Sequence, residues 1–219
     1  MLNFNSKFGR KFLKFGNFLA MIVSVNLVWI VISLPSIAML LIMISSKTLK
    51  SFLTALVLLT VMNSVFLLPA TTDVYLMILK LEQQKRRGSF FKETFTNYLQ
   101  LRTEYLFFLA FSFFISGWLF LFMDFKNQVF ASAFLLGVGL ILMIIFLAWS
   151  LSLSPLVAEN CYELILSAPL KLLGASLILL TLIMLNVFLR LSFLLVLCSI
   201  SLAAYLAIKL LWKADESVY

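Results

Sequence analysis

The sequence Leu68-Pro69-Ala70-Thr71-Thr72-Asp73-Val74-Tyr75 opens the segment that decides the fold. Residues 68–104 separate two uncharged runs, each long enough to cross a bilayer as a helix. The segment holds six of the seventeen basic residues, namely Lys80, Lys85, Arg86, Arg87, Lys92 and Arg102. Because cytosolic loops of membrane proteins are rich in Lys and Arg, we predict that this segment faces the cytosol and orients the other helices.

The composition indicates a membrane protein. Hydrophobic residues make up 63% of the 219 residues, and charged residues only 12%. A soluble domain has about 45–50% apolar and about 25% charged residues. The apolar runs are continuous, so the excess needs a lipid bilayer as its solvent. The predicted fold class is all-α, a polytopic integral membrane helical bundle.

The charges and the missing residue types argue against several functions. The net charge of +8 does not indicate nucleic-acid binding, because the basic residues gather beside apolar runs. Histidine is absent, and Cys161 and Cys198 lack metal-ligand spacing. The sequence contains no nucleophile motif and no phosphate-binding loop. We therefore predict no enzymatic activity, no catalytic residue, no metal and no cofactor.

Residues 1–17 form a predicted basic amphipathic segment. Phe4, Phe8, Phe12 and Phe15 recur at helical spacing, and lysines precede three of them by one residue. Such a segment suits an anionic lipid surface, or it serves only as a basic flank that orients the first helix. The uncharged run after it is too long for a signal peptide, so we expect it to be retained as an anchor.

Residues 18–211 are predicted to form one domain of six transmembrane helices, at about 18–44, 51–81, 105–123, 129–154, 170–187 and 192–211. A polar tail, 212–219, follows. The last two helices divide an apolar stretch, 172–208, that contains a single charge, Arg190. One straight helix of that length would be roughly 55 Å long, against a hydrocarbon core of about 30 Å. We therefore predict a hairpin turn near 186–191.

Six crossings place both termini on one face of the membrane. That face carries thirteen of the Lys and Arg residues, and the opposite face carries four. The positive-inside rule therefore predicts that both termini are cytosolic. The protein is expected to be a multi-pass protein of the plasma membrane.

Polar residues and prolines within the apolar runs are candidate functional positions. Asn26, Asn63 and Asp73 could contact a substrate or a partner helix. Alternatively, the two asparagines form hydrogen bonds between helices, and Asp73 is an interface charge. The candidate hinges are Pro35, Pro69 and Pro155. Alternatively, these prolines are tolerated kinks, and neighbouring hydroxyls cover the carbonyls that they leave free.

Two predicted cytosolic corners carry the remaining candidates. Lys85, Arg86 and Arg87 could bind an acidic partner or anionic lipid head groups, or they could only set the topology. Glu159 and Glu163 are expected one helical turn apart, where they could bind a cation or act as an acid–base pair. A solvated helix face is the alternative, because no third ligand accompanies them.

The prolines also suggest an internal repeat. Pro69 and Pro155 are each followed by an acidic residue four positions later and by a tyrosine soon after. The helix pairs on either side could therefore be same-sense repeats, as in some transporters. Chance recurrence of common residue types is the alternative.

The pattern Asn26-Leu27-Val28-Trp29-Ile30, followed by Ser33-Leu34-Pro35, resembles the first-helix pattern of the YesL-type family of bacterial polytopic membrane proteins of unknown function. The resemblance also includes Leu68-Pro69-Ala70-Thr71, Tyr75, the basic stretch 85–88, and the aromatic residues Phe91, Phe95 and Tyr98. It covers most of residues 20–110 and weakens beyond them. The resemblance implies a bacterial plasma membrane location and a link to carbohydrate utilisation.

The resemblance further implies partners among the permease or ATPase subunits of sugar ABC transporters. It implies no catalytic residue. The resulting hypothesis is a non-enzymatic membrane accessory protein associated with a carbohydrate-uptake system. The alternative is a small solute transporter or channel that acts on its own, although few buried charges are available to couple ion movement.

Overall fold

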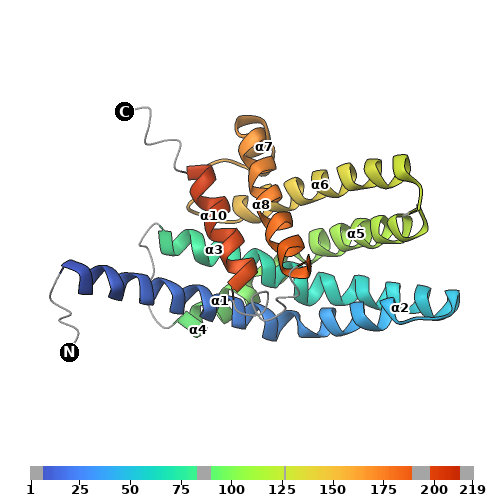
Figure 1. The fold of residues 1–219 in the computed structure, drawn as a ribbon, viewed down its shortest axis with the longest axis horizontal. Helices are drawn as coiled ribbons and strands as arrows, with labels where there is room; N and C mark the ends of the chain where they lie inside the picture. Colours follow the sequence, from blue (N-terminus) through green and yellow to red (C-terminus); the bar gives the residue numbers. More distant parts are fainter. Residues whose placement is uncertain (1–6, 83–89, 126, 189–197, 213–219) are drawn as a thin grey trace.

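The computed structural model describes residues 7–82, 90–125, 127–188 and 198–212. This part of the chain consists of helices joined by short turns, with no strand, so the predicted all-α fold is confirmed there. Figure 1 shows α1, α2, α3, α5 and α6 running roughly along the long axis of the molecule. Four helical segments are long and apolar enough to cross a membrane: Phe15–Ile44, Leu49–Leu81, Tyr105–Phe125 and Val129–Ser152.

Helix α1 (Lys7–Ile44) is one continuous helix of 38 residues. The sequence divides this region into an amphipathic segment and a span at residue 18. The structure joins them, because no residue between them breaks the helix. Pro35 lies inside α1 without ending it. A turn leads to α2 (Leu49–Met62), whose first turn is closed by a capping box between Thr48 and Ser51.

The second predicted span, 51–81, contains a break that the apolar pattern does not show. It consists of α2, the π-helix η1 (Asn63–Leu67) and α3 (Leu68–Glu82). Pro69 lies in the first turn of α3. Because proline has no backbone N–H, it disturbs the hydrogen-bond ladder of the preceding turn, and a π-turn stands at that position.

The predicted cytosolic segment before the third span is helical from residue 90 onward. It contains α4 (Phe90–Gln100) and the 3₁₀-helix η2 (Leu101–Glu104), which leads directly into α5 (Tyr105–Phe125). Helix α6 (Val129–Ser152) follows and ends two residues before the predicted boundary at 154.

The remaining helices are α7 (Cys161–Ser167), α8 (Pro169–Phe188) and α10 (Ile200–Trp212). Helices α7 and α8 are bent by 97° at their junction, and the pair counts as a fifth candidate span if it is taken as one unit. Lys171 Nζ, near the start of α8, donates to the carbonyl of Leu211, near the end of α10, at 3.3 Å. The two helices are therefore antiparallel, as the predicted hairpin requires. Half of the predicted turn, residues 189–191 with Arg190, lies outside the described residues.

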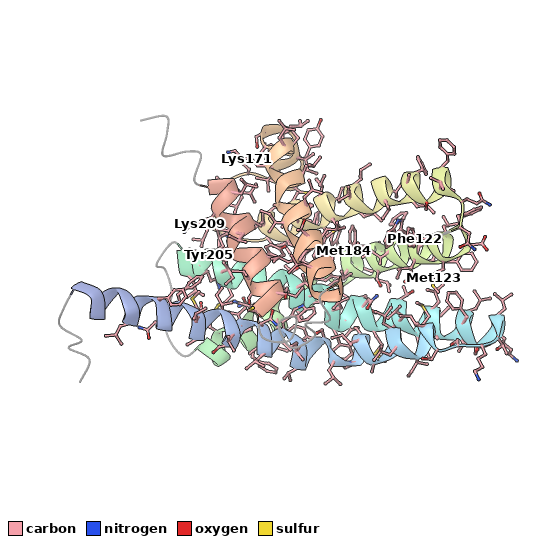
Figure 2. The ribbon with its side chains drawn as sticks, viewed as in Figure 1. Phe122, Met123, Lys171, Met184, Tyr205 and Lys209 are labelled. Carbon is pink, nitrogen blue, oxygen red and sulfur yellow. The ribbon has the colours of Figure 1, made fainter. Side chains whose placement is uncertain are left out.

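The α8–α10 hairpin crosses the direction of the long helices at a steep angle (Figure 1). Lys171 and Met184 lie near opposite ends of α8, and Lys209 lies on α10 toward the Lys171 end (Figure 2). Helix α10 has 13 residues, or about 20 Å at 1.5 Å per residue, which is less than the thickness of a hydrocarbon core. The four longer helices indicate a multi-pass protein in a lipid bilayer.

Helix α3 lies at the centre of the core. Six consecutive residues, from Val74 to Leu79, are each at most 7% exposed. A helix that is buried on all sides must be surrounded by other elements. Here those elements are α1, α4, α6 and α10, all of which contact α3. The polar side chains of Thr72, Asp73 and Tyr75 on α3 are therefore placed against protein rather than lipid.

Candidate functional site

Four polar side chains meet where α4 packs against α3, and we call this set the polar seam: Asp73, Lys80, Glu93 and Asn97. Lys80 Nζ donates a 2.9 Å hydrogen bond to Asn97 Oδ1 and lies 3.7 Å from Glu93 Oε1. Asp73 and Lys80 are seven residues apart on α3, and Glu93 and Asn97 are four apart on α4. These spacings put each pair on one helix face.

The polar seam is only partly hydrogen-bonded. Asp73 is 1% exposed, and its carboxyl interacts with Asn97, Lys80 and Glu93. However, Asp73 Oδ1, Glu93 Oε2 and Asn97 Nδ2 are buried and have no hydrogen bond of normal geometry in the described part of the chain. Buried polar atoms are nearly always hydrogen-bonded in folded proteins. The two carboxylate oxygens can therefore accept hydrogen bonds from a small polar group, and the amide nitrogen can donate one to it.

A second connection between α4 and the α2–α3 segment comes from Tyr98, the residue after Asn97. The phenol of Tyr98 donates a 2.8 Å hydrogen bond to the carbonyl of Val65 in η1. Val65 is four residues before Pro69, so its carbonyl would accept the N–H that proline lacks. The sequence predicts that a neighbouring hydroxyl such as that of Thr71 could cover this carbonyl, but Thr71 donates to the Leu67 carbonyl at 2.7 Å instead.

A cavity of about 330 Å³ lies beside this connection. Its apolar walls come from Val65, Pro69, Leu101 and Phe108, and its hydroxyl groups come from Ser64, Tyr98 and Tyr105. Phe108 and Ser64 are fully buried, and Tyr105 is 39% exposed. The cavity is thus closed by η1 and α5 on its inner side and is more open at Tyr105.

Asn26 has a structural role that accounts for its burial. Its side-chain oxygen accepts hydrogen bonds from the backbone N–H groups of Ile200 and Ser201, at 3.1 and 3.2 Å. Both N–H groups belong to the first two residues of α10. In addition, Ser201 Oγ donates to the Ile22 carbonyl at 2.8 Å. Asn26 therefore caps α10 from α1, which corresponds to the interhelical alternative for this residue.

Asn63 and the three candidate hinge prolines have different surroundings. Asn63 is 4% exposed at the first position of η1, and its Oδ1 has no hydrogen bond among the described residues. Pro35 and Pro69 lie within α1 and α3, whereas Pro155 lies in the non-helical segment between α6 and α7. Pro69 and Pro155 are therefore not structurally equivalent, which argues against the internal repeat.

The two candidate glutamates of the second corner are held by local bonds. Glu163 Oε2 accepts from the N–H of Asn160, and Asn160 Oδ1 accepts from the N–H of Glu163, which forms the capping box of α7. Glu159 precedes α7, and its Oε2 accepts from Ser167 Oγ at 3.0 Å. The prediction that both residues lie on one helix, a turn apart, is wrong, because the helix begins at Cys161.

Lys85, Arg86 and Arg87 lie outside the described residues. Within the ranges that the structure describes, no group of three His, Cys, Asp or Glu side chains could hold a metal ion. Of the predicted site residues, only Asp73 and Pro69 belong to the seam or the cavity. The sequence does contain a partial signal for the seam, because the spacing of seven residues on α3 and of four on α4 puts both members of each pair on one helix face.

Comparisons of the chain with protein-family models, with curated proteins and with solved structures found no significant match. The resemblance of residues 20–110 to the YesL-type family therefore stays a prediction.

Proposed function

We propose that the protein is a non-enzymatic accessory subunit of a membrane transport system and that it binds its partner through α4. The observation that carries this proposal is that one face of α4 packs against α3 while the opposite face exposes apolar side chains. Its inner face is held by Lys80 through Glu93 and Asn97, while Phe95 is 57% and Leu99 38% exposed on its outer face. Two apolar side chains one turn apart are the anchors that a partner helix or groove recognises.

The partner class in this proposal rests on the family resemblance. That resemblance favours a permease or an ATPase subunit of a bacterial carbohydrate-uptake ABC transporter. In the sequence, Lys85, Arg86 and Arg87 immediately precede α4. Their charge would add attraction to an acidic partner surface or to anionic lipid head groups near the membrane.

The proposal places α4 and both chain termini in the cytosol of a bacterial cell. The four long spans return the chain to its starting side, and the antiparallel α8–α10 pair returns it again whether or not it crosses fully. In this proposal α8 and α10 cross as a pair, which gives the six crossings expected from the sequence. A cysteine placed by Arg86→Cys, with Cys161 and Cys198 replaced by serine, is expected to react with an impermeant label only after the cells are opened. Reaction in intact cells would reverse the orientation.

Affinity purification from native membranes tests the partner. Tagged wild-type protein is expected to recover a permease or ATPase subunit, and Phe95→Ala/Leu99→Ala to recover at least tenfold less. A matched control is Phe130→Ala/Phe134→Ala, which removes two residues of the same spacing that are 93% and 71% exposed on α6. Wild-type protein that repeatedly purifies alone would contradict the proposal.

The second candidate is a small solute transporter or channel. The observation that favours it is the cavity beside the π-helix and Pro69, because interrupted helices line the substrate sites of many transporters. Solute uptake into proteoliposomes that contain only this chain would support this candidate over the accessory role.

A further inference from the structure

The cavity beside η1 is distinct from the polar seam, because none of the four seam side chains lines it. Its volume of about 330 Å³ is at the lower end of the range of about 300–1,000 Å³ for small-molecule sites. The π-turn at Asn63–Leu67 forms one wall. Single π-turns inside helices occur frequently at functional sites, because they displace the backbone from the regular helical path. The cavity can therefore hold part of a ligand.

Hydrogen bonds between α2 and α5 define the depth of the cavity in the membrane. Thr60 Oγ1 donates to Ser116 Oγ at 2.7 Å, and Ser112 Oγ donates to the Thr60 carbonyl at 2.7 Å. The two helices are antiparallel, so equal steps forward on one and backward on the other reach the same level. Pro69 is nine residues after Thr60, and Tyr105 is nine residues before the midpoint of Ser112 and Ser116. Both residues line the cavity, so its two sides lie at one level.

In the proposed orientation, the length of α2 and η1 fits this level to the inner edge of the hydrocarbon core. Pro69 is 20 residues beyond Leu49, the start of α2, which corresponds to about 30 Å of helix and to one hydrocarbon thickness. Tyrosine is enriched at this boundary, where its ring contacts lipid and its hydroxyl contacts polar groups. The ester groups that join lipid head groups to their acyl chains occupy the same boundary.

The chemistry of the lining suits a neutral ligand. No charged side chain is among the described residues that line the cavity. Leu101, Phe108 and Pro69 offer an apolar surface for an alkyl chain. Tyr105 makes no hydrogen bond with any described residue and is 39% exposed, so its phenol is available at the mouth. A phenol can donate to an ester carbonyl or exchange a hydrogen bond with a glycerol hydroxyl.

We propose that this cavity binds the glycerol-ester portion of a membrane lipid. The first carbons of one acyl chain lie between Leu101 and Phe108, and an ester or hydroxyl oxygen is hydrogen-bonded to Tyr105. The head group remains outside, because the lining residues that the structure describes carry no charge to bind it. This site is independent of the partner surface on α4, so either proposal can fail without the other.

Native mass spectrometry of the full-length chain in mild detergent tests the site, with dioleoyl phosphatidylglycerol, dioleoyl phosphatidylethanolamine and monoolein as separate probes. The wild-type protein is expected to retain one molecule of each with similar affinity, because the glycerol ester is common to all three. Val65→Phe, which fills the cavity, should reduce retention at least tenfold. Tyr105→Phe should reduce it about fivefold, since it removes one neutral hydrogen bond and keeps the ring.

The Phe130→Ala/Phe134→Ala variant is the control for lipids that bind only at the protein surface, and it should retain the probes as the wild type does. Tyr105→Phe conserves volume and so tests the site even where Val65→Phe does not fold. Equal retention by the wild type and both cavity variants would overturn the proposal. So would retention of phospholipids but not monoolein, or displacement of the lipid by a water-soluble neutral solute.

Discussion

The phenol of Tyr98 on α4 is hydrogen-bonded, at 2.8 Å, to the backbone carbonyl of Val65, which is four residues before Pro69. A proline in a helix leaves such a carbonyl without its usual donor. The break in the α2–α3 segment is thus closed by a side chain from the helix that follows it. This single contact links the π-helix η1, a wall of the cavity and the packing of α4.

Removal of the Tyr98 hydroxyl should destabilise the protein through this contact. We expect Tyr98→Phe to lower the free energy of unfolding by about 1–2 kcal/mol, because it removes the donor to a partly buried carbonyl. Reversible unfolding in detergent–SDS mixtures measures the change. Tyr162→Phe, at a tyrosine that is 71% exposed, is the matched control and should have no effect.

Pro69→Ala provides a double-mutant test of the same contact. Alanine restores a backbone N–H near Val65, so the cost of Tyr98→Phe should be smaller in the Pro69→Ala background. A coupling of about 0.5 kcal/mol or more is expected for residues that share one partner. Strictly additive effects would show that Tyr98 does not compensate for the proline.

The contacts of Lys80 should decide how firmly α4 is held. Lys80→Met keeps the chain length but removes the donor to Asn97 Oδ1 and the partner of Glu93. Because both side chains are largely buried, we expect a loss of about 1–3 kcal/mol. Hydrogen–deuterium exchange should increase across 90–100 and remain unchanged in α6. Lys47→Met, at an exposed turn, is the control, and equal exchange in both variants would contradict the role of the seam.

Asn26 should matter for α10 rather than for ligand binding. Asn26→Leu removes the acceptor for two N–H groups at the start of α10, and we expect it to cost about 1–3 kcal/mol. Exchange should increase most at 200–204, although the substitution is in α1. Ser24→Ala removes only a bond to its own helix, from Ser24 Oγ to the Ala20 carbonyl, and should change little. Unchanged exchange at 200–204 would show that the cap is dispensable.

Two glycines on α6 form a matched pair. A Cβ at Gly139 would lie 2.8 Å from Trp118 Cζ2, whereas a Cβ at Gly137 would have nothing within 4 Å. Trp118 cannot move freely, because its Nε1 donates to the Leu135 carbonyl at 2.7 Å. We expect Gly139→Ala to cost about 1–3 kcal/mol by overpacking, and Gly137→Ala to be neutral or slightly stabilising. Unfolding measurements that rank the two variants in the opposite order would refute the packing argument.

The candidate site was predictable only in part. Asp73 and Pro69 stand out in the sequence because a charge and a proline are rare within apolar runs. Lys80, Glu93 and Asn97 do not stand out, because polar residues are expected in a cytosolic segment. Their connection depends on how α4 packs against α3, which no local pattern encodes. Glu159 and Glu163 show the opposite error, since their spacing suggested one helix face but a capping box starts the helix between them.

The sequence by itself determined the helices and the solvent in which they fold. Apolar runs of sufficient length, separated by short basic segments, predict membrane helices, because burial of uninterrupted apolar surface needs lipid. Only the tertiary structure decided that the α8–α10 hairpin crosses the long helices steeply, that Asn26 caps α10, and that Tyr98 closes the break at Pro69. The last two contacts join residues 174 and 33 positions apart. In each, a backbone group is hydrogen-bonded by a side chain that the packing of another helix brings to it.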